Sequence, residues 1–385
     1  MSTEAAAAEA AGRIPPLAHD RRVQAWAVST GISMAGDAAW TLGLAWTAAS
    51  VGGAHGAGLV LGVGTLPRAL LTVFGGAIAD RADARRTMVA SNLARIVVLL
   101  AGLAVLSMSD VTIPLLVAIA VVFGAIDALY RPAASTLPRQ LVREGDLGGV
   151  AAMFQLANRL AGFVGAPLGG LLVAVGGLRL VMLADIASFL VISVVLALVV
   201  KPRFARQLSG SASVRADIAA GLGYIRRTPA IRTLVLALSG LNLFVGPVLA
   251  VGLVLRARGQ GWSSTSLGLM EATLAVAAAV ASAYAIFWRP ARPARTGLLL
   301  LVAQAAACVA VGVAPYLGAY GAMVVIGVTA GLASSLLSGV FQRAVDPQYL
   351  GRTGSIQALG DDALMPVAMV GFGALAAATS VAIGC

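Results

Sequence analysis

The sequence predicts an all-α membrane protein, and three observations support this. Of the 385 residues, 59% are hydrophobic and only 11% are charged, whereas a soluble domain has about 25% charged residues. The apolar residues form blocks of about 20, which is the length of a helix that spans a bilayer. The blocks are continuous and lack the alternation of membrane-barrel strands, so we expect helices.

We expect eleven spans in two groups, because each block reaches the bilayer length and is bounded by charged or turn-forming residues. A twelfth would begin near Thr379, where only TSVAIGC follows, so we interpret the twelfth helix as missing or truncated. The expected spans are 23–48, 57–79, 88–108, 112–135, 150–175, 179–200, 231–255, 264–288, 297–314, 316–340 and 353–376.

Four regions follow from these spans. Residues 1–22 are a cytoplasmic tail, 23–200 a six-helix bundle, 201–230 a cytoplasmic linker and 231–385 a second bundle that is incomplete at its end. In the linker, Ile218, Leu222 and Ile225 share a helical face, which predicts an amphipathic helix on the inner membrane surface. A solvated linker is the alternative.

The arginines predict the orientation. The chain has 27 basic residues. With the N-terminus in the cytoplasm, 21 of them lie on the inner side, three on the outer side and three within helices. This distribution follows the positive-inside rule and predicts a multi-pass protein of the cell inner (plasma) membrane. Attraction to the anionic inner leaflet explains the net charge of +11 without a nucleic acid partner.

Several classes of site are excluded by residue usage. The two cysteines form no CxxC pair and there are two histidines, so we expect no metal site. Walker A, HExxH and GxSxG motifs are absent from the sequence. We therefore expect neither an enzyme, nor a cofactor, nor ATP-driven transport.

The loop GGAIADRADARRT, from Gly75 to Thr87, concentrates charge between the second and third expected spans. It resembles the signature loop of the major facilitator superfamily, G-x-x-x-D-R-x-G-R-R. Asp83 replaces the usual glycine and Ala84 the usual arginine, and this variant resembles an exporter branch that contains macrolide and siderophore efflux proteins. The matching residues are Gly76, Asp80, Arg81 and Arg85.

The resemblance implies two six-helix bundles with pseudo-two-fold symmetry, and it implies a conformational switch in this loop. Asp80 would face the N-terminal end of helix three or pair with Arg131 in only one conformation. A simple topology anchor is the alternative reading of the loop, to which Asp83 would contribute nothing.

A second segment of the chain, NRLAGFVGAPLGG, resembles the antiporter signature of helix five. The resemblance implies that it packs between the bundles and is associated with antiport, whereas generic close packing of small residues is equally compatible with it. Its candidate residues are Arg159, Gly165, Pro167, Gly169 and Gly170.

Ionisable residues inside spans are costly and are therefore functional candidates. Asp37 in helix one is the first candidate for proton coupling or substrate contact. Arg95 can pair with Asp37 or with Asp127, although Asp127 can also pair locally with Arg131. We expect Asp185 to lie at the membrane interface.

The remaining candidates are spread over both halves. Glu271 is the second candidate for proton coupling, because it lies within helix eight. Asp361 and its neighbour Asp362 are expected to face the central cavity, and Arg68 follows Pro67, whose missing N–H can open helix two locally.

The sequence thus predicts a proton-coupled exporter of an amphiphilic small molecule that works by alternating access. We expect it to act as a monomer whose partners are the substrate, protons and the bilayer. Nutrient uptake is one alternative, and a non-transporting membrane sensor or scaffold is another. The sequence does not identify the substrate.

Overall fold

The computed structural model describes residues 15–79, 83–204 and 214–385. In these ranges, nine helical stretches are long and apolar enough to cross a membrane. Two of them are double, because α2 (Arg21–Ala79) breaks at Gly53 and α5 (Leu147–Val194) breaks at Gly177. Both glycines have a positive φ, of 57° and 62°, a conformation that residues with a side chain rarely adopt. The nine stretches therefore contain the eleven predicted spans.

The helices divide into two halves joined by a connecting segment. In the first half, the short helices η1 (Leu17–His19) and η2 (Glu144–Asp146) accompany α2, α3 (Ala84–Met108), α4 (Ile113–Leu141), α5 and the π-helical η3 (Val195–Val199). The connecting helix α6 (Val214–Arg227) packs on α7 and α12. The second half contains α7 (Pro229–Pro247), the π-helical η4 (Val248–Gly252), α8 (Leu253–Gly259), α9 (Ser264–Phe287), α10 (Pro293–Val313), α11 (Tyr316–Ala344), α12 (Pro347–Ala378) and α13 (Val381–Gly384).

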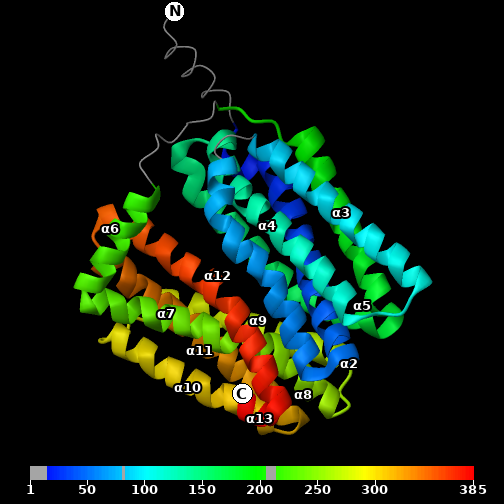
Figure 1. Ribbon diagram of the computed structural model, residues 1–385. Coiled ribbons are helices and arrows are strands. Elements are labelled where there is room, and N and C mark those ends of the chain that lie inside the picture. The colour runs from blue at the N-terminus through cyan, green and yellow to red at the C-terminus, as the bar shows by residue number, and fades with distance from the viewer. Residues whose placement is uncertain (1–14, 80–82, 205–213) are drawn as a thin grey trace, which may run out of the picture.

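The two halves meet along two seams, α2 with α12 and α5 with α9. They converge toward α8 and α13 and diverge toward α6 (Figure 1). Glycines allow the close approach, since a Cβ atom on Gly58 would lie 2.8 Å from the Cα of Gly373. In the other seam, the Ser264 hydroxyl donates to the carbonyl oxygen of Gly170 over 2.8 Å. The halves are therefore in contact at one end and apart at the other.

Several predicted boundaries are wrong, since α3 begins at Ala84 and not at 88, and α12 begins at Pro347 and not at 353. The stretch after residue 48 is helical up to the turn at Gly53, and α4 continues past residue 135 to Leu141. The helix α4 contains both Pro132 and Pro138. A proline removes one backbone hydrogen bond, and neighbouring helices can compensate for that loss in a membrane bundle.

The span formed by α7 and α8 contains a π-helical turn, η4, directly after Pro247. A π-turn accommodates one extra residue within an otherwise α-helical span. Its last residue, Gly252, lies against the ring of Phe372 from α12, where a Cβ atom would come within 2.8 Å of the ring. The wider turn thus lies at a tight contact between α7 and α12.

Candidate functional site

A cavity of about 750 Å³ lies in the first half and is lined by α2, α3, α4 and the beginning of α5. One face of α2 contributes a stripe of polar and aromatic side chains at helical spacing. This spacing was visible in the sequence, but only Asp37 was singled out there. The stripe consists of Trp26, Thr30, Ser33, Asp37, Trp40 and Thr41.

Arg95 is the most deeply enclosed cation that lines this cavity, with 3% of its surface exposed. It forms an ion pair with Asp127, which is one of the two predicted partners. Its guanidinium also lies over the rings of Tyr130, at 4.7 Å, and Phe189, at 5.1 Å. A buried cation is stabilised when a carboxylate and aromatic faces replace its hydration. In the described part of the chain, Asp127 pairs across helices with Arg95 and not with Arg131, one turn away.

Asp37 lines the same cavity and is half-buried. Arg95, Asp127 and Arg131 line the cavity with it, yet its carboxylate forms no ion pair with any described residue. The backbone carbonyl of Asp37 accepts the hydroxyl of Thr41 over 2.8 Å, so the acidic side chain itself is left available to the cavity.

Asp185 does not lie at the membrane interface as expected. Its side chain is fully buried between α5 and α2. Ser188 donates to its Oδ1 over 3.2 Å, while Oδ2 has no hydrogen-bond partner in the described structure. A Cβ atom on Gly36 would lie 2.6 Å from the same Oδ1. The helix that carries Asp185 begins after Gly177 and packs along α2, which places residue 185 inside the bundle.

The candidates at the seam and in the second half differ in their polar contacts. Arg68 lines the cavity and forms a 3.2 Å ion pair with Asp362 of α12, so this pair connects the two halves. Asp361 instead accepts a 2.9 Å hydrogen bond from the Asn242 amide of α7. Glu271 is half-buried in α9, does not line the cavity and has no polar partner among the described residues.

Only part of the signature loop is described. Asp80 and Arg81 lie outside the described residues, and of Gly76 only the helical backbone is described. Asp83 is the N-cap of α3 and accepts the backbone N–H of Arg86 over 2.9 Å. An aspartate at an N-cap stabilises the first turn of a helix, which gives Asp83 a role that the sequence reading did not find.

The two remaining arginines of the predicted switch, Arg85 and Arg131, have different environments. Arg85 donates to the carbonyl oxygens of Leu196 and Ala197 in η3, the first over 2.6 Å. It therefore satisfies carbonyls at a helix end that would otherwise lack donors. Arg131 is exposed and lines the cavity.

The glycines of helix five lie at close contacts. Gly165 and Gly169 pack against the backbone of α2, and a Cβ atom on Gly169 would lie 2.7 Å from the Cα of Ala39. Gly170 packs instead against Ser264 of α9, in the other half. Pro167 is inside the helix at the same contact, beside Gly268 of α9. Arg159 is exposed and outside the cavity.

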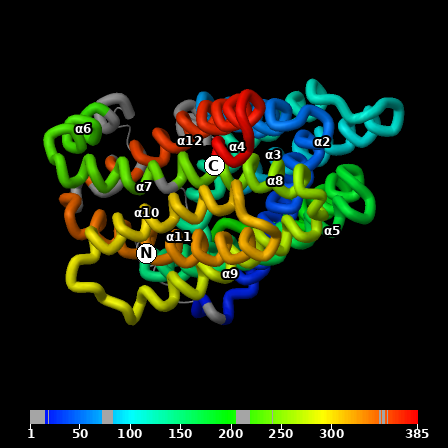
Figure 2. Tube along the Cα trace, turned by 90° about the horizontal axis from the view of Figure 1, so that it is seen from below, coloured from blue at the N-terminus to red at the C-terminus, as the bar shows by residue number. Residues whose placement is uncertain are grey.

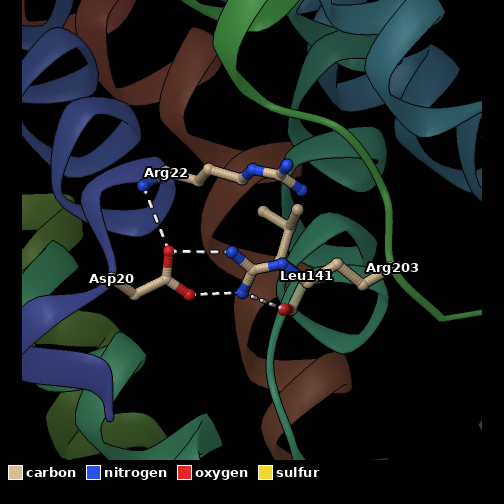
Figure 3. A network of polar contacts seen from close by, with 4 residues as sticks. All are labelled: Asp20, Arg22, Leu141 and Arg203. Carbon is tan, nitrogen blue, oxygen red and sulfur yellow. Dashed lines mark hydrogen bonds and ion pairs between the residues drawn. The ribbon is translucent and has the colours of Figure 1, made fainter. Parts of the chain in front are cut away.

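A buried polar cluster at the start of α2 was not predicted. Asp20 is 2% exposed and accepts two bonds from the Arg203 guanidinium, one of them 2.9 Å long (Figure 3). It also accepts the backbone N–H of Arg22, which makes it an N-terminal cap of α2. Arg203 further donates to the carbonyl of Leu141 over 3.3 Å. The cluster therefore ties together the beginning of α2, the end of α4 and the segment after η3.

The charge of Asp20 is stabilised by this cluster. Burial raises the pKa of the Asp20 carboxyl, but the hydrogen bond and the positive charge of Arg203 together lower it further, so the pKa lies below its ordinary value of 3.8. A cap residue in the sequence, an aspartate directly before an apolar helix, could have identified Asp20. Its partner is 183 residues away and could not have been identified in this way.

The sequence matches the Major Facilitator Superfamily over residues 26–379. The chain belongs to this superfamily. A comparison with curated proteins gave no match. The fold of this superfamily member is similar to several solved transporter structures, all of low sequence identity, so the likeness concerns the fold alone.

One similar structure is a bacterial homologue of the human lysosomal transporter Spinster in an inward-facing, unoccupied conformation. It has 16% identity and a TM-score of 0.70 and covers 93% of this chain and 82% of the other. The nucleoside transporter NupG has 10% identity and a TM-score of 0.70, with 94% and 95% covered.

A bacterial homologue of the iron transporter ferroportin is similar in two states, each at 16% identity. The inward-facing state has a TM-score of 0.73, covering 96% of this chain and 97% of the other. The outward-facing state has a TM-score of 0.62, with 94% of each chain covered. The TM-score is thus higher for the inward-facing state than for the outward-facing state of that protein.

Proposed function

We propose that this superfamily member is a secondary transporter that exports an amphiphilic small molecule in exchange for protons. The observation that carries the proposal is the cavity in the first half, which combines aromatic walls with an unpaired carboxylate, Asp37. Ligand cavities of roughly 300–1,000 Å³ are typically apolar with a few placed polar groups, and this cavity of about 750 Å³ has that composition.

The chemistry of the walls favours an amphiphilic substrate. Trp40 packs on Phe123 with ring centroids 5.5 Å apart, and Trp26 packs on Phe154 at 4.4 Å. Phe154 is partly exposed and offers apolar surface to a hydrophobic body, whereas Trp26, Trp40 and Phe123 are more than 90% buried. Asp37 offers a negative charge when it is deprotonated. A cationic group of the substrate can neutralise this charge in place of a proton.

Asp37 is the proposed coupling residue for a physical reason. When the halves close over the cavity, water leaves, and a bare carboxylate in the membrane interior is costly. Closure is therefore favoured when Asp37 carries a proton or contacts a cationic substrate. Alternation between these two states gives antiport, in which the proton and the substrate use the carboxyl in turn.

The Arg68–Asp362 pair supports a role for the seam in this cycle. It joins α2 to α12 where the contact between the halves gives way to the cavity. Separation of the halves on the closed side must break this pair and open the tight contacts at Gly58 and Gly170. We place the protein in the plasma membrane with a cytoplasmic N-terminus, on the strength of the arginine distribution. The cavity then opens to the cytoplasm in this conformation, as the loading step of an exporter requires.

The test compares the parent with Asp37→Asn and Glu271→Gln at matched membrane levels in an efflux-deficient bacterial host. The probes are the cationic dye rhodamine 6G and the macrolide erythromycin. We expect the parent to lower probe accumulation until a protonophore removes the proton gradient. The Asp37→Asn variant is expected to lose this export, and Glu271→Gln to keep it.

Purified protein in liposomes separates coupling from binding. Asp37→Asn should still exchange dye for dye across the membrane, at a higher half-saturating dye concentration because the charge contact is lost, but fail to drive dye against a gradient when a pH difference is imposed. Accumulation that rises with the parent would indicate uptake instead. Loss of coupling only in Glu271→Gln would move the coupling site to the second half.

A further inference from the structure

The first half contains a buried carboxyl that the proposed transport cycle does not use. Asp185 belongs to the second span of α5, which follows Gly177 and packs on α2 and α3 (Figure 2). Its side chain is 0% exposed, does not line the cavity and forms no ion pair with any described residue. A carboxylate at such a position is costly, because neither water nor a paired cation compensates its charge.

The hydrogen bonds of Asp185 suit a neutral acid. The Ser188 oxygen lies 2.8 Å from the backbone carbonyl oxygen of Asp185 and 3.2 Å from its Oδ1. A serine hydroxyl has one hydrogen. When this hydrogen goes to the carbonyl, the contact with Oδ1 needs a donor on the carboxyl, which a protonated Asp185 supplies. Its Oδ2, which has no partner in the described structure, is then an uncharged carbonyl oxygen.

A buried cation lies beside the same segment of α5. The Arg95 guanidinium is 5.1 Å from the ring centre of Phe189, which is one turn after Asp185 on the helix. Arg95 pairs with Asp127, but its Nε has no hydrogen-bond partner among the described residues. A buried donor on Arg95 and a buried acceptor on Asp185 are therefore both unsatisfied where α3 packs on α5, and a change of the Arg95 rotamer can join them.

The helices packed around Asp185 carry few other titratable groups in this region. Those described are Asp37 of α2, Arg95 of α3, and Asp127, Tyr130 and Arg131 of α4, which reaches α5 through the contact of Phe123 with Phe189. Of the two cations, Arg131 is exposed and Arg95 is buried. The Asp127 side chain is 32% exposed and lines the cavity, so Asp127 can exchange protons with cavity water whereas Asp185 cannot.

We propose that Asp185 is a second proton site of the transport cycle, which holds a proton while Arg95 pairs with Asp127 and releases it when Arg95 pairs with Asp185 instead. The proton passes from Asp185 to Asp127, the carboxylate that Arg95 has left, and from there to the cavity water. Arg95 keeps its charge throughout. The release of this proton rests on the proposed function, whereas the protonation of Asp185 and the exchange of partners do not require transport.

The first measurement is the infrared C=O stretching band of protonated carboxyls, recorded at pH 7 on the full chain in lipid nanodiscs. All samples carry Asp37→Asn, so that the proposed coupling carboxyl adds no band. We expect Asp185→Asn to remove one band in the difference spectrum. Asp110→Asn, which changes an exposed aspartate of the first half, should remove none. If Asp185→Asn removes no band, the carboxyl is ionised and the proposal is wrong.

Asp127→Asn tests the exchange of partners. It deprives Arg95 of its present carboxylate, so Arg95 should pair with Asp185 and the Asp185 band should disappear. In the double variant Arg95→Leu with Asp127→Asn this cation is absent, and the band should return. A proton that only stabilises the fold would be insensitive to Asp127→Asn. A band that persists unchanged in this variant would therefore overturn the exchange of partners.

The number of protons exchanged for each dye tests the place of Asp185 in the cycle. The protein is reconstituted in liposomes with rhodamine 6G and the membrane potential is held at zero. Loss of one proton per dye makes the dye gradient that a pH difference of one unit supports about tenfold smaller in Asp185→Asn than in the parent. An equal gradient in both would mean that the Asp185 proton does not leave during transport. If the parent moves no dye, the proposed function fails, and the infrared bands still decide whether Asp185 holds a proton.

Discussion

The third helix of the first half and the third helix of the second half carry a polar residue at the same position but satisfy it differently. Arg95 and Gln304 are each the twelfth residue of their helices, α3 and α10. Arg95 has Asp127, Tyr130 and Phe189 as partners, whereas Gln304 has none in the described structure.

This difference shows that helices at equivalent positions in the two halves can have different roles. A polar residue in the middle of a span needs a hydrogen-bond or charge partner, because the bilayer interior provides none. In the first half, residues of the protein itself pair with the charge of Arg95, and the cavity lies next to this ion pair. In the second half, the buried Gln304 lines an apolar groove and has no hydrogen-bond partner in the described structure. The polar part of the candidate transport site accordingly lies in the first half.

The largest expected effect comes from removing the charge of Arg95. Arg95→Leu should lower the free energy of unfolding by about 3 kcal/mol, because it leaves the Asp127 carboxylate without its cation. Thermal unfolding in detergent, followed by intrinsic fluorescence, measures the change. Adding Asp127→Asn should restore most of the loss. If the double variant is as unstable as Arg95→Leu, the loss comes from the aromatic contacts of Arg95 and not from the uncompensated charge.

A smaller effect is expected at the seam that joins the two regions. Gly170→Leu should lower the free energy of unfolding by about 2 kcal/mol, because the new side chain collides with the backbone of Ser264 and Thr265. Gly162→Leu is the matched control on the same helix, where a Cβ atom meets nothing within 4 Å.

The same pair of variants tests whether the seam sets the distance between the halves. Spin labels at the exposed positions Ser50 and Gln260 report this distance at the closed end. We expect it to increase in Gly170→Leu and to stay unchanged in Gly162→Leu. An unchanged distance in both would mean that the halves are held together elsewhere.

The smallest effect is expected at the cluster of Asp20 and Arg203, which belongs to the first half alone. Asp20→Asn should lower the free energy of unfolding by only about 1 kcal/mol at neutral pH, because the asparagine oxygen can still accept hydrogen bonds and the Arg203 side chain is 15% exposed to water. The folded-state pKa of Asp20 lies below its ordinary value of 3.8. The contribution of the pair is therefore complete above about pH 5 and is lost as the pH falls through the folded-state pKa.

The measurement is the stability difference between the parent and Asp20→Asn from pH 7 down to pH 3. It should be constant near neutrality and shrink in the acid range. Arg203→Gln should show the same profile. A difference that does not change with pH would mean that the Asp20 carboxylate contributes through its shape and not through its charge.

The helices could be predicted from the sequence because a span is a local property. Twenty apolar residues must be helical in a bilayer, wherever they pack. The breaks at Gly53 and Gly177 lie in the predicted gaps 49–56 and 176–178. The continuation of α4 past residue 135 and through Pro138 could not be predicted, because it depends on which neighbours replace lost hydrogen bonds. Asp185 was misplaced for the same reason, since depth along a span does not show which face of the helix is covered.

The candidate site was predictable only in part. Asp37, Arg95 and Asp127 stood out because charge is rare inside spans, and the structure brings them to one cavity. The neutral residues that line the same wall, such as Thr30 and Ser33, share a helical face with Asp37. They carry no charge, so their residue type does not mark them as candidates. Glu271 has the same sequence signal as Asp37 and lies outside the cavity, so intramembrane charge alone does not identify the site.

The π-helical turn η4 sets the rotational register of its span. Successive residues of an α-helix are about 100° apart around the axis, and a π-turn inserts one residue without lengthening the span by a full turn. If the turn became regular α-helix with the same number of residues, α8 would rotate by about that angle relative to α7. Arg258, whose guanidinium now lies 5.2 Å from the centre of the Trp46 ring, would then point away from the first half. The contact between Arg258 and Trp46, which joins the halves at this end, thus depends on the geometry of one helical turn.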